Sequence, residues 1–176
     1  MNRQTKKVIL GGFFIALGFI LPFMTGQIPA IGSRLLPMHI PVFLGGFICG
    51  GPIGLMIGFI VPLLRSAIYS MPPMFPMAIS MAFELGVYGL ATGLVYKILP
   101  KNKMNVYITL IISMVLGRMA WGIVSALLYR SIGMDFSMDM FIMMGFINAI
   151  PGIIIQLVLI PIIVIALEKA GLIDHE

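Results

Sequence analysis

The sequence MPPMFPMAISMAFELGVYG, at residues 71–89, places a carboxylate inside a long apolar run that follows a proline-rich turn. Other apolar runs of this length occur along the chain and are typical of helices that cross a lipid bilayer. A carboxylate at that depth is energetically expensive unless it is paired or lines a polar cavity. The sequence therefore predicts that Glu84 belongs to the wall of a buried polar pocket.

The composition of the whole chain indicates a membrane protein. Of the 176 residues, 60% are hydrophobic and 10% are charged, and the mean hydropathy is +1.12. A soluble domain has about 25% charged residues. With about 20 residues for each crossing, the length allows about six helices joined by short loops. We expect an all-α integral membrane protein in which residues 1–176 form a single six-helix domain.

Prolines, glycines and polar residues divide the chain into six expected helices. Their approximate bounds are residues 6–24, 37–49, 53–68, 76–98, 105–129 and 138–170. Pro62 is expected to kink the third helix, because proline removes a helical hydrogen bond. The sixth helix is expected to bend at Pro151 and again near Pro161. Residues 25–36 are expected to form a loop, and the first apolar run lacks a signal-peptide cleavage site and is expected to be retained.

Basic residues predict the orientation of these helices. They gather at the two termini and at the turn after the fourth helix, namely Arg3, Lys6, Lys7, Lys97, Lys101, Lys103 and Lys169. Cytoplasmic loops of membrane proteins carry an excess of lysine and arginine. Both termini are therefore expected in the cytoplasm, and the net charge of +5 is attributed to orientation in a bacterial plasma membrane rather than to nucleic-acid binding.

Polar residues in the outer half of the predicted membrane region are candidate binding residues. Glu84 is eight residues from Pro76, at the outer end of its helix, which is a depth of roughly 12 Å. The full set is Arg34, His39, Arg65, Glu84, Tyr88, Arg118, Trp121 and Asn148. The two arginines within helices outnumber the one glutamate, which favours an anionic group on a ligand. The alternative is that Glu84 and Arg118 form only a structural ion pair.

Motifs of several enzyme classes are missing from the sequence. There is no P-loop for ATP hydrolysis, no H-E-x-x-H zinc motif and no G-x-S-x-G nucleophile motif. With Cys49 as the single cysteine and two histidines, no metal site is expected, and the sixteen methionines are interpreted as apolar filling. We expect a protein without enzymatic activity and without a cofactor.

Four segments carry a resemblance to a known family: LLPMHIP at 35–41, MPPMFPM at 71–77, FEL at 83–85 and LGR at 116–118. With the six short-looped helices, they resemble the substrate-binding S component of an energy-coupling factor (ECF) vitamin transporter. The resemblance implies that the chain binds a scarce water-soluble vitamin or related micronutrient, with the loop at residues 25–36 as a lid. It also implies association with a transmembrane coupling subunit and two cytoplasmic ATPases.

The first helix offers a surface for such an association. Gly12 and Ala16 are four residues apart, and small residues at this spacing let another helix approach closely. The alternative is ordinary packing within the chain. The resemblance maps the alanine-x-x-x-alanine docking motif of the family onto these two positions, with glycine in place of the first alanine.

The substrate and two other functions stay open at this point. Pantothenate is the first expectation, because of the arginine surplus, and riboflavin, a folate or a pyrimidine precursor are further candidates. A stand-alone carrier that uses Glu84 as a proton site is one alternative function. A membrane scaffold protein without a ligand is the other.

Overall fold

A computed structural model describes residues 2–25, 28–100 and 102–171 of the chain. Lys101 and residues 26 and 27 of the expected loop lie outside the described residues. The described part is built from helices, with no strand. In order they are α1 (Arg3–Ile20), η1 (Leu21–Thr25), α2 (Pro29–Leu35), α3 (His39–Cys49), α4 (Gly51–Tyr69), η2 (Met74–Ala78), α5 (Ile79–Ile98), α6 (Lys103–Ser131), α7 (Met138–Ile142), η3 (Met143–Ile147) and α8 (Ile150–Lys169).

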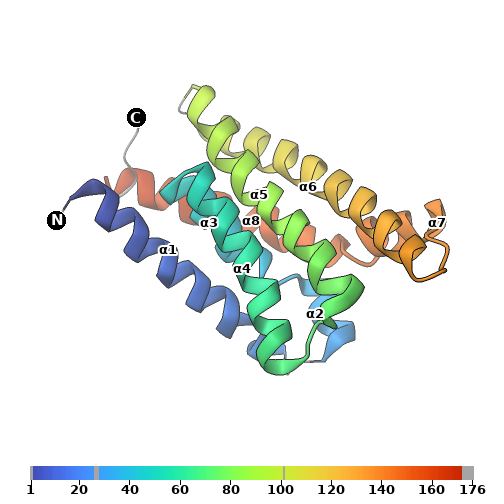
Figure 1. Cartoon of the computed structure of the whole chain (residues 1–176). Coiled ribbons are helices and arrows are strands. Elements are labelled where there is room, and N and C mark those ends of the chain that lie inside the picture. The colour runs from blue at the N-terminus through green and yellow to red at the C-terminus, as the bar shows by residue number, and fades with distance from the viewer. Residues whose placement is uncertain (1, 26–27, 101, 172–176) are drawn as a thin grey trace.

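Six helical segments are long and apolar enough to cross a membrane, which confirms the predicted fold class. They are Gln4–Met24, Ala30–Cys49, Gly51–Tyr69, Met74–Ile98, Lys103–Ser131 and Ile150–Lys169. Figure 1 shows the start of α1, the end of α8 and the end of α5 at one end of the bundle, and α2 with the α4–α5 connection at the other. An even number of crossings explains why both termini share one end.

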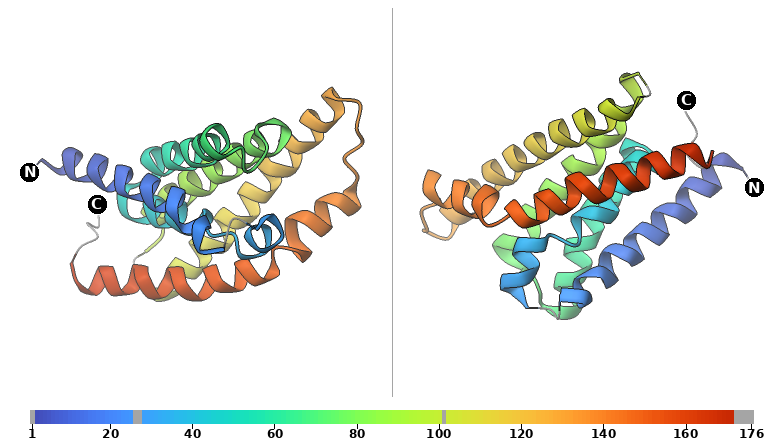
Figure 2. Two further views of the ribbon diagram at one scale, coloured as in Figure 1. Left: turned by 90° about the horizontal axis from the view of Figure 1, so that it is seen from below. Right: turned by 180° about the vertical axis from the view of Figure 1, so that it is seen from behind.

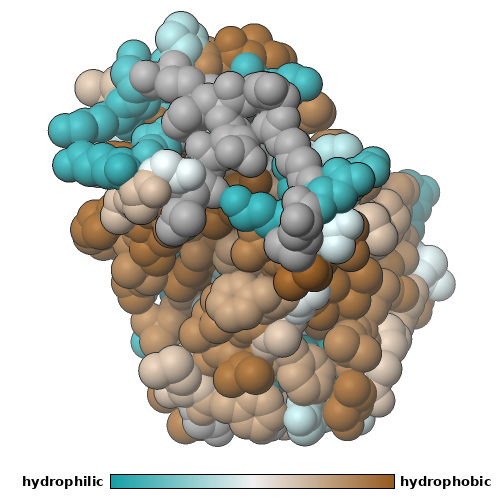
Figure 3. Space-filling model, turned by 90° about the vertical axis from the view of Figure 1, so that its left-hand side faces the viewer, coloured by the Kyte–Doolittle hydropathy of each residue, from teal (hydrophilic) through white to brown (hydrophobic). Residues whose placement is uncertain are grey.

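The end of the bundle that carries the termini is marked by polar side chains. In the view of Figure 3, hydrophilic residues gather in the upper part of this face, while hydrophobic residues cover most of the lower part. Large apolar side chains are exposed along the helices, for example Ile9 on α1, Ile111 on α6 and Ile154 on α8. Such a surface suits helices that are surrounded by lipid and end in a polar layer.

Helix α5 lies at the centre of the bundle and packs against α3, α4 and α6 (Figure 1). Its close contact with α4 depends on glycines. A Cβ at Gly54 would lie 2.6 Å from the carbonyl oxygen of Gly89, and one at Gly58 would lie 2.2 Å from that of Leu85. These distances are shorter than real Cβ contacts, so only glycine lets the two backbones approach this closely.

Helix α8 covers the rear of the bundle, where it packs against α3 and α6 (Figure 2). The buried core between these helices includes Phe43 of α3, Leu85 of α5, Leu110 of α6 and Ile160 of α8.

The prediction of a loop at residues 25–36 is wrong in part, because the segment contains the short helix α2. A proline in the first turn of α2 presets the helical φ angle, and Leu36 ends the helix with a left-handed φ of 51°. The helix also packs against α8, where a Cβ at Gly152 would lie 2.7 Å from the carbonyl oxygen of Arg34. Tertiary packing therefore stabilises a segment whose composition is typical of a loop.

The expected single helix at residues 138–170 is also wrong. It is divided into α7, η3 and α8, with the break at Asn148 and Ala149. Pro151 does not bend a continuous helix but lies in the first turn of α8, where its missing N–H costs nothing. Helices α4 and α8 both continue past their internal prolines, Pro62 and Pro161.

Candidate functional site

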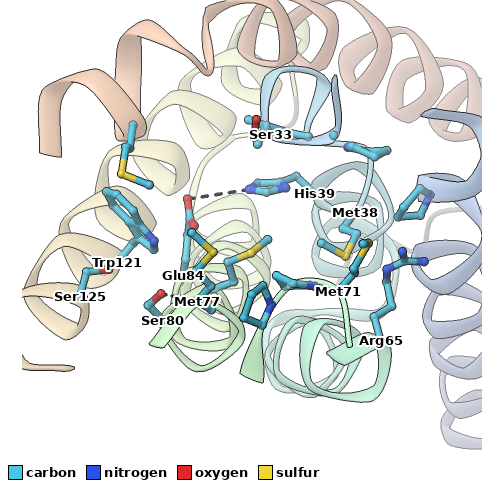
Figure 4. A pocket seen from close by; sticks show the side chains of 18 of the residues that line it. Ser33, Met38, His39, Arg65, Met71, Met77, Ser80, Glu84, Trp121 and Ser125 are labelled. Atoms are coloured by element: carbon cyan, nitrogen blue, oxygen red, sulfur yellow. Dashed lines mark hydrogen bonds and ion pairs between the residues drawn. The ribbon is translucent and has the colours of Figure 1, made fainter. Parts of the chain in front are cut away.

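A cavity of about 450 Å³ lies at the end of the bundle away from the termini (Figure 4). It is lined by η1, α2, the first residues of α3 and α5, the last turns of α4, the α4–η2 connection, η2, the second half of α6, and η3. The lining residues are Pro22, Ile28, Ala30, Gly32, Ser33, Leu36, Pro37, Met38, His39, Arg65, Met71, Pro72, Pro73, Met77, Ser80, Met81, Glu84, Arg118, Trp121, Ser125, Tyr129 and Met144. The volume is within the range of small-molecule binding sites, which are mostly apolar with a few placed polar groups.

Glu84 and Arg118 form an ion pair on one side of the cavity. The Arg118 Nη1 atom lies 2.7 Å from Glu84 Oε1, and both residues are buried. The same oxygen accepts a hydrogen bond of 2.8 Å from the hydroxyl of Tyr88, one turn further along α5. Within the described residues, the arginine that pairs with Glu84 is therefore Arg118.

His39 reaches the same group of side chains from the first turn of α3. Its Nε2 atom lies 3.8 Å from Glu84 Oε1, marked by the dashed line in Figure 4, which is too long for a hydrogen bond. Both ring nitrogens are buried, and neither has a hydrogen-bond partner among the described residues. A buried polar atom without a partner is costly, and a ligand that bonds to it would remove that cost. The two nitrogens of this imidazole lie beside the cavity, where a neutral ring offers one donor and one acceptor.

Arg65 lines another part of the cavity, at the last turns of α4. Its Nη1 atom donates a 2.7 Å hydrogen bond to the carbonyl oxygen of Phe19, near the end of α1. The guanidinium carbon lies 5.9, 5.5 and 5.6 Å from the ring centroids of Phe19, Phe23 and Tyr69. Figure 4 shows Arg65 and Glu84 on opposite sides of the cavity.

Trp121 forms the wall on the side of α6. Its ring packs against Phe136 and Phe141, with centroid distances of 5.6 and 6.0 Å. Gly122 provides the space, because a Cβ there would lie 2.5 Å from the Phe141 ring. Trp121 is therefore held by aromatic contacts to the α6–α7 connection and to α7, and it presents its indole to the cavity.

Three of the eight residues predicted from the sequence do not line the cavity. Tyr88 is buried below it, stacked on Phe43 with a centroid distance of 4.8 Å, and it supports Glu84 through the hydroxyl. Arg34 and Asn148 are exposed side chains on α2 and at the start of the α8 region. His39, Arg65, Glu84, Arg118 and Trp121 all line it.

Sequence reasoning missed the methionines and serines of the lining. Met77, Ser80 and Met81 precede Glu84 by seven, four and three residues, so they share its face of α5. Ser125 follows Trp121 by four residues on α6. Helical spacing from the charged residues could have identified them, whereas Met71 and Met144 come from other segments and have no such signal.

The face of α1 that contains Gly12 and Ala16 is open. Both residues are exposed, and a Cβ built on Gly12 would have no atom within 4 Å. The face of α1 that packs against α4 carries Gly11 and Gly18, where a Cβ would lie 2.9 Å from Ile53 and 3.0 Å from Val61. Packing within the described chain therefore accounts for Gly11 and Gly18 but not for Gly12.

A family model for the substrate-specific component of ECF transporters matches residues 6–164. The chain belongs to this family. It is a multi-pass membrane protein and the substrate-specific subunit of an ECF transporter, a class that binds small molecules and pairs with a coupling subunit and ATPases. Comparison with curated proteins and with solved structures gave no match.

Proposed function

We propose that this S component captures a water-soluble vitamin or related micronutrient from outside the cell, in the cavity between α2 and the Glu84–Arg118 pair. The observation that carries the proposal is the buried polar group of His39, Glu84 and Arg118 on the wall of a 450 Å³ cavity. Polar groups at that depth in a membrane protein are expensive and mark a functional site by default.

The proposal places the cavity at the outer side of a bacterial plasma membrane and both termini in the cytoplasm. The basic residues of the terminal end, with Lys6, Lys97 and Lys169 among them, support this orientation. The chain itself then acts as a binding subunit without enzymatic activity, and energy comes from two cytoplasmic ATPases through a coupling subunit. The open face around Gly12 and Ala16 supports α1 as the surface that meets the coupling subunit.

Five methionines in the lining support a ligand with an apolar body. They are Met38, Met71, Met77, Met81 and Met144. Methionine side chains adapt their shape and make favourable contacts with apolar and aromatic groups. Pantothenate remains the first candidate, because its gem-dimethyl group is apolar and its carboxylate fits a cavity that has one more arginine than glutamate.

Mass spectrometry of the protein purified in detergent tests the proposal. We expect one small molecule per chain to co-purify. A saturating concentration of the vitamin that it is identified with should displace it. A protein that carries no small molecule and gains no thermal stability from a panel of vitamins would favour a scaffold protein instead.

A second experiment separates ATP-driven uptake from a stand-alone carrier. Proteoliposomes that contain this chain alone should take up no labelled vitamin, with or without a proton gradient. Proteoliposomes that also contain the coupling subunit and the ATPases should take it up only with ATP inside the compartment that the ATPases face. Uptake by the chain alone would favour Glu84 as a proton site.

A further inference from the structure

The two arginines of the cavity differ in how their charges are balanced. The Arg118 guanidinium lies 2.7 Å from the Glu84 carboxylate, so this pair is neutral as a unit. Arg65 has no carboxylate within ion-pair distance in the described part of the chain, although its residue is only 3% exposed. The surplus positive charge of the cavity therefore belongs to Arg65.

The neighbours of Arg65 stabilise its charge without neutralising it. The carbonyl of Phe19 and the faces of three aromatic rings surround the guanidinium, and such contacts favour a cation. A guanidinium has five N–H donors. The bond to Phe19 uses a donor on Nη1, while the Nε atom is buried without a hydrogen-bond partner.

The opposite side of the cavity offers a different set of groups. Glu84 presents carboxylate oxygen, Arg118 presents N–H groups, and His39 has two ring nitrogens without partners. The Arg118 charge is already balanced by Glu84, so a second negative charge placed there would meet no unbalanced cation in a site of low dielectric. An uncharged group with both a donor and an acceptor matches this side better. Figure 4 shows Met38 and Met71 between the two sides, so the span that joins them is apolar.

We propose that the ligand is an elongated molecule with one carboxylate, which binds Arg65, and an uncharged hydrogen-bonding group at the other end, which binds His39, Glu84 and Arg118. This inference rests on the proposed function and assigns the ends of the ligand to the two sides of the cavity. A planar carboxylate suits the guanidinium fork, which can donate two parallel hydrogen bonds. One unbalanced arginine matches a ligand with one negative charge.

The test compares a carboxylate with its uncharged counterpart in the purified full-length chain. The probes are pantothenate and pantothenol, in which an alcohol replaces the carboxylate, and binding is measured by calorimetry. If neither binds, the co-purified molecule and its carboxamide take their place. R65Q removes the charge but keeps an N–H group for the Phe19 carbonyl, and R65K keeps the charge without the planar fork. R130Q, at an exposed arginine near the end of α6, is the matched control.

We expect the wild type and R130Q to bind the acid more tightly than the uncharged probe. R65Q should lose about tenfold or more in affinity for the acid, with no change in affinity for the uncharged probe. R65K should bind the acid with intermediate affinity. If R65Q does not fold, the affinity of R65K for the acid shows whether Arg65 binds the carboxylate. A co-purified ligand without an anionic group, or an R65Q protein that keeps the full preference for the acid, would overturn this assignment while leaving the proposed function intact. A chain that binds no small molecule at all would overturn the proposed function itself.

Discussion

The Arg118 guanidinium on α6 lies 2.7 Å from the Glu84 carboxylate on α5, and the two side chains are 7% and 2% exposed. Neither charge would be tolerated alone at this depth. Removing one partner of a buried ion pair costs about 3–5 kcal/mol, because the other charge is left without compensation. We therefore expect E84Q and R118Q to lower the thermal unfolding temperature in detergent, and the double variant E84Q/R118Q to regain much of the loss.

The same double variant separates a structural role from a role in binding. If the pair only stabilises the bundle, a protein with restored stability should bind ligand as the wild type does. We expect instead that E84Q/R118Q binds at least tenfold more weakly, because charged hydrogen-bond partners contribute about 1.5–3 kcal/mol. Calorimetry with the ligand identified by mass spectrometry gives the measurement, and R130Q again serves as the control.

Tyr88 offers a test of how the Glu84 carboxylate is held in place. The hydroxyl donates a 2.8 Å hydrogen bond to Glu84 Oε1, and the ring is stacked on Phe43. Y88F removes only the hydroxyl, so we expect a loss of about 1–3 kcal/mol in stability and weaker binding, although Tyr88 does not line the cavity. Y107F, at a partly exposed tyrosine of α6, should change neither quantity. Equal behaviour of the two variants would contradict a positioning role for Tyr88.

Gly117 on α6 leaves the space that the Tyr88 ring occupies. A Cβ at this position would lie 2.1 Å from the ring, whereas a Cβ at Gly12 would meet nothing within 4 Å. Overpacking of a core costs about 1–3 kcal/mol, so G117A should destabilise the protein and move Tyr88 away from Glu84. G12A should be neutral in the same thermal unfolding assay. A neutral G117A would mean that α5 and α6 separate without cost at this contact.

The global fold could be predicted from the sequence because its signals are local. They are the hydropathy of each segment and the number of residues between a polar residue and the end of its helix. Counting residues from the predicted outer helix ends places Glu84, Arg118, His39 and Arg65 in the outer half of the membrane, and all four line one cavity. Partner choice could not be predicted in this way. The pairing of Glu84 with Arg118 involves tertiary contacts between α5 and α6, among them Gly117, where a Cβ would lie 3.0 Å from the carbonyl oxygen of Glu84.

Arg34 and Asn148 do not line the cavity, and both belong to segments whose secondary structure differs from the prediction. The sequence predicts a loop at Arg34, but the segment forms α2 and the Arg34 side chain is exposed. Asn148 was assigned to the interior of a continuous helix, but the chain breaks there before Pro151 starts α8. Both differences in secondary structure arise in short helical elements whose stability depends on tertiary packing rather than on propensity.

The exposed small residues of α1 predict how the chain meets its coupling subunit. G12L would place a branched side chain on the face that carries Gly12 and Ala16, which is free of contacts within the described chain at Gly12. We expect G12L to bind ligand normally and to fail to co-purify with the coupling subunit, because close helix packing needs small residues. G12A keeps the surface small and should still assemble. Normal assembly of G12L would place the docking surface elsewhere.

Gly152 lies where α8 packs against α2, the helix that forms part of the cavity wall. At this position α8 meets α2, and a Cβ would lie 2.7 Å from the carbonyl oxygen of Arg34 and 2.9 Å from the side chain of Leu36. Since α2 supplies Ala30, Gly32 and Ser33 to the lining, a larger residue at Gly152 should push α2 away from the cavity.

We therefore expect G152V to raise the dissociation rate of the ligand about tenfold, which corresponds to about 1.4 kcal/mol, and to leave the association rate within a factor of about three, because affinity changes at one site arise mostly in dissociation. Stopped-flow displacement of a labelled ligand measures both rates. G12V adds the same side chain where no atom is near and serves as the control. If G152V and G12V release the ligand at the wild-type rate, α2 is a fixed wall of the cavity, and the ligand must enter and leave by a different route.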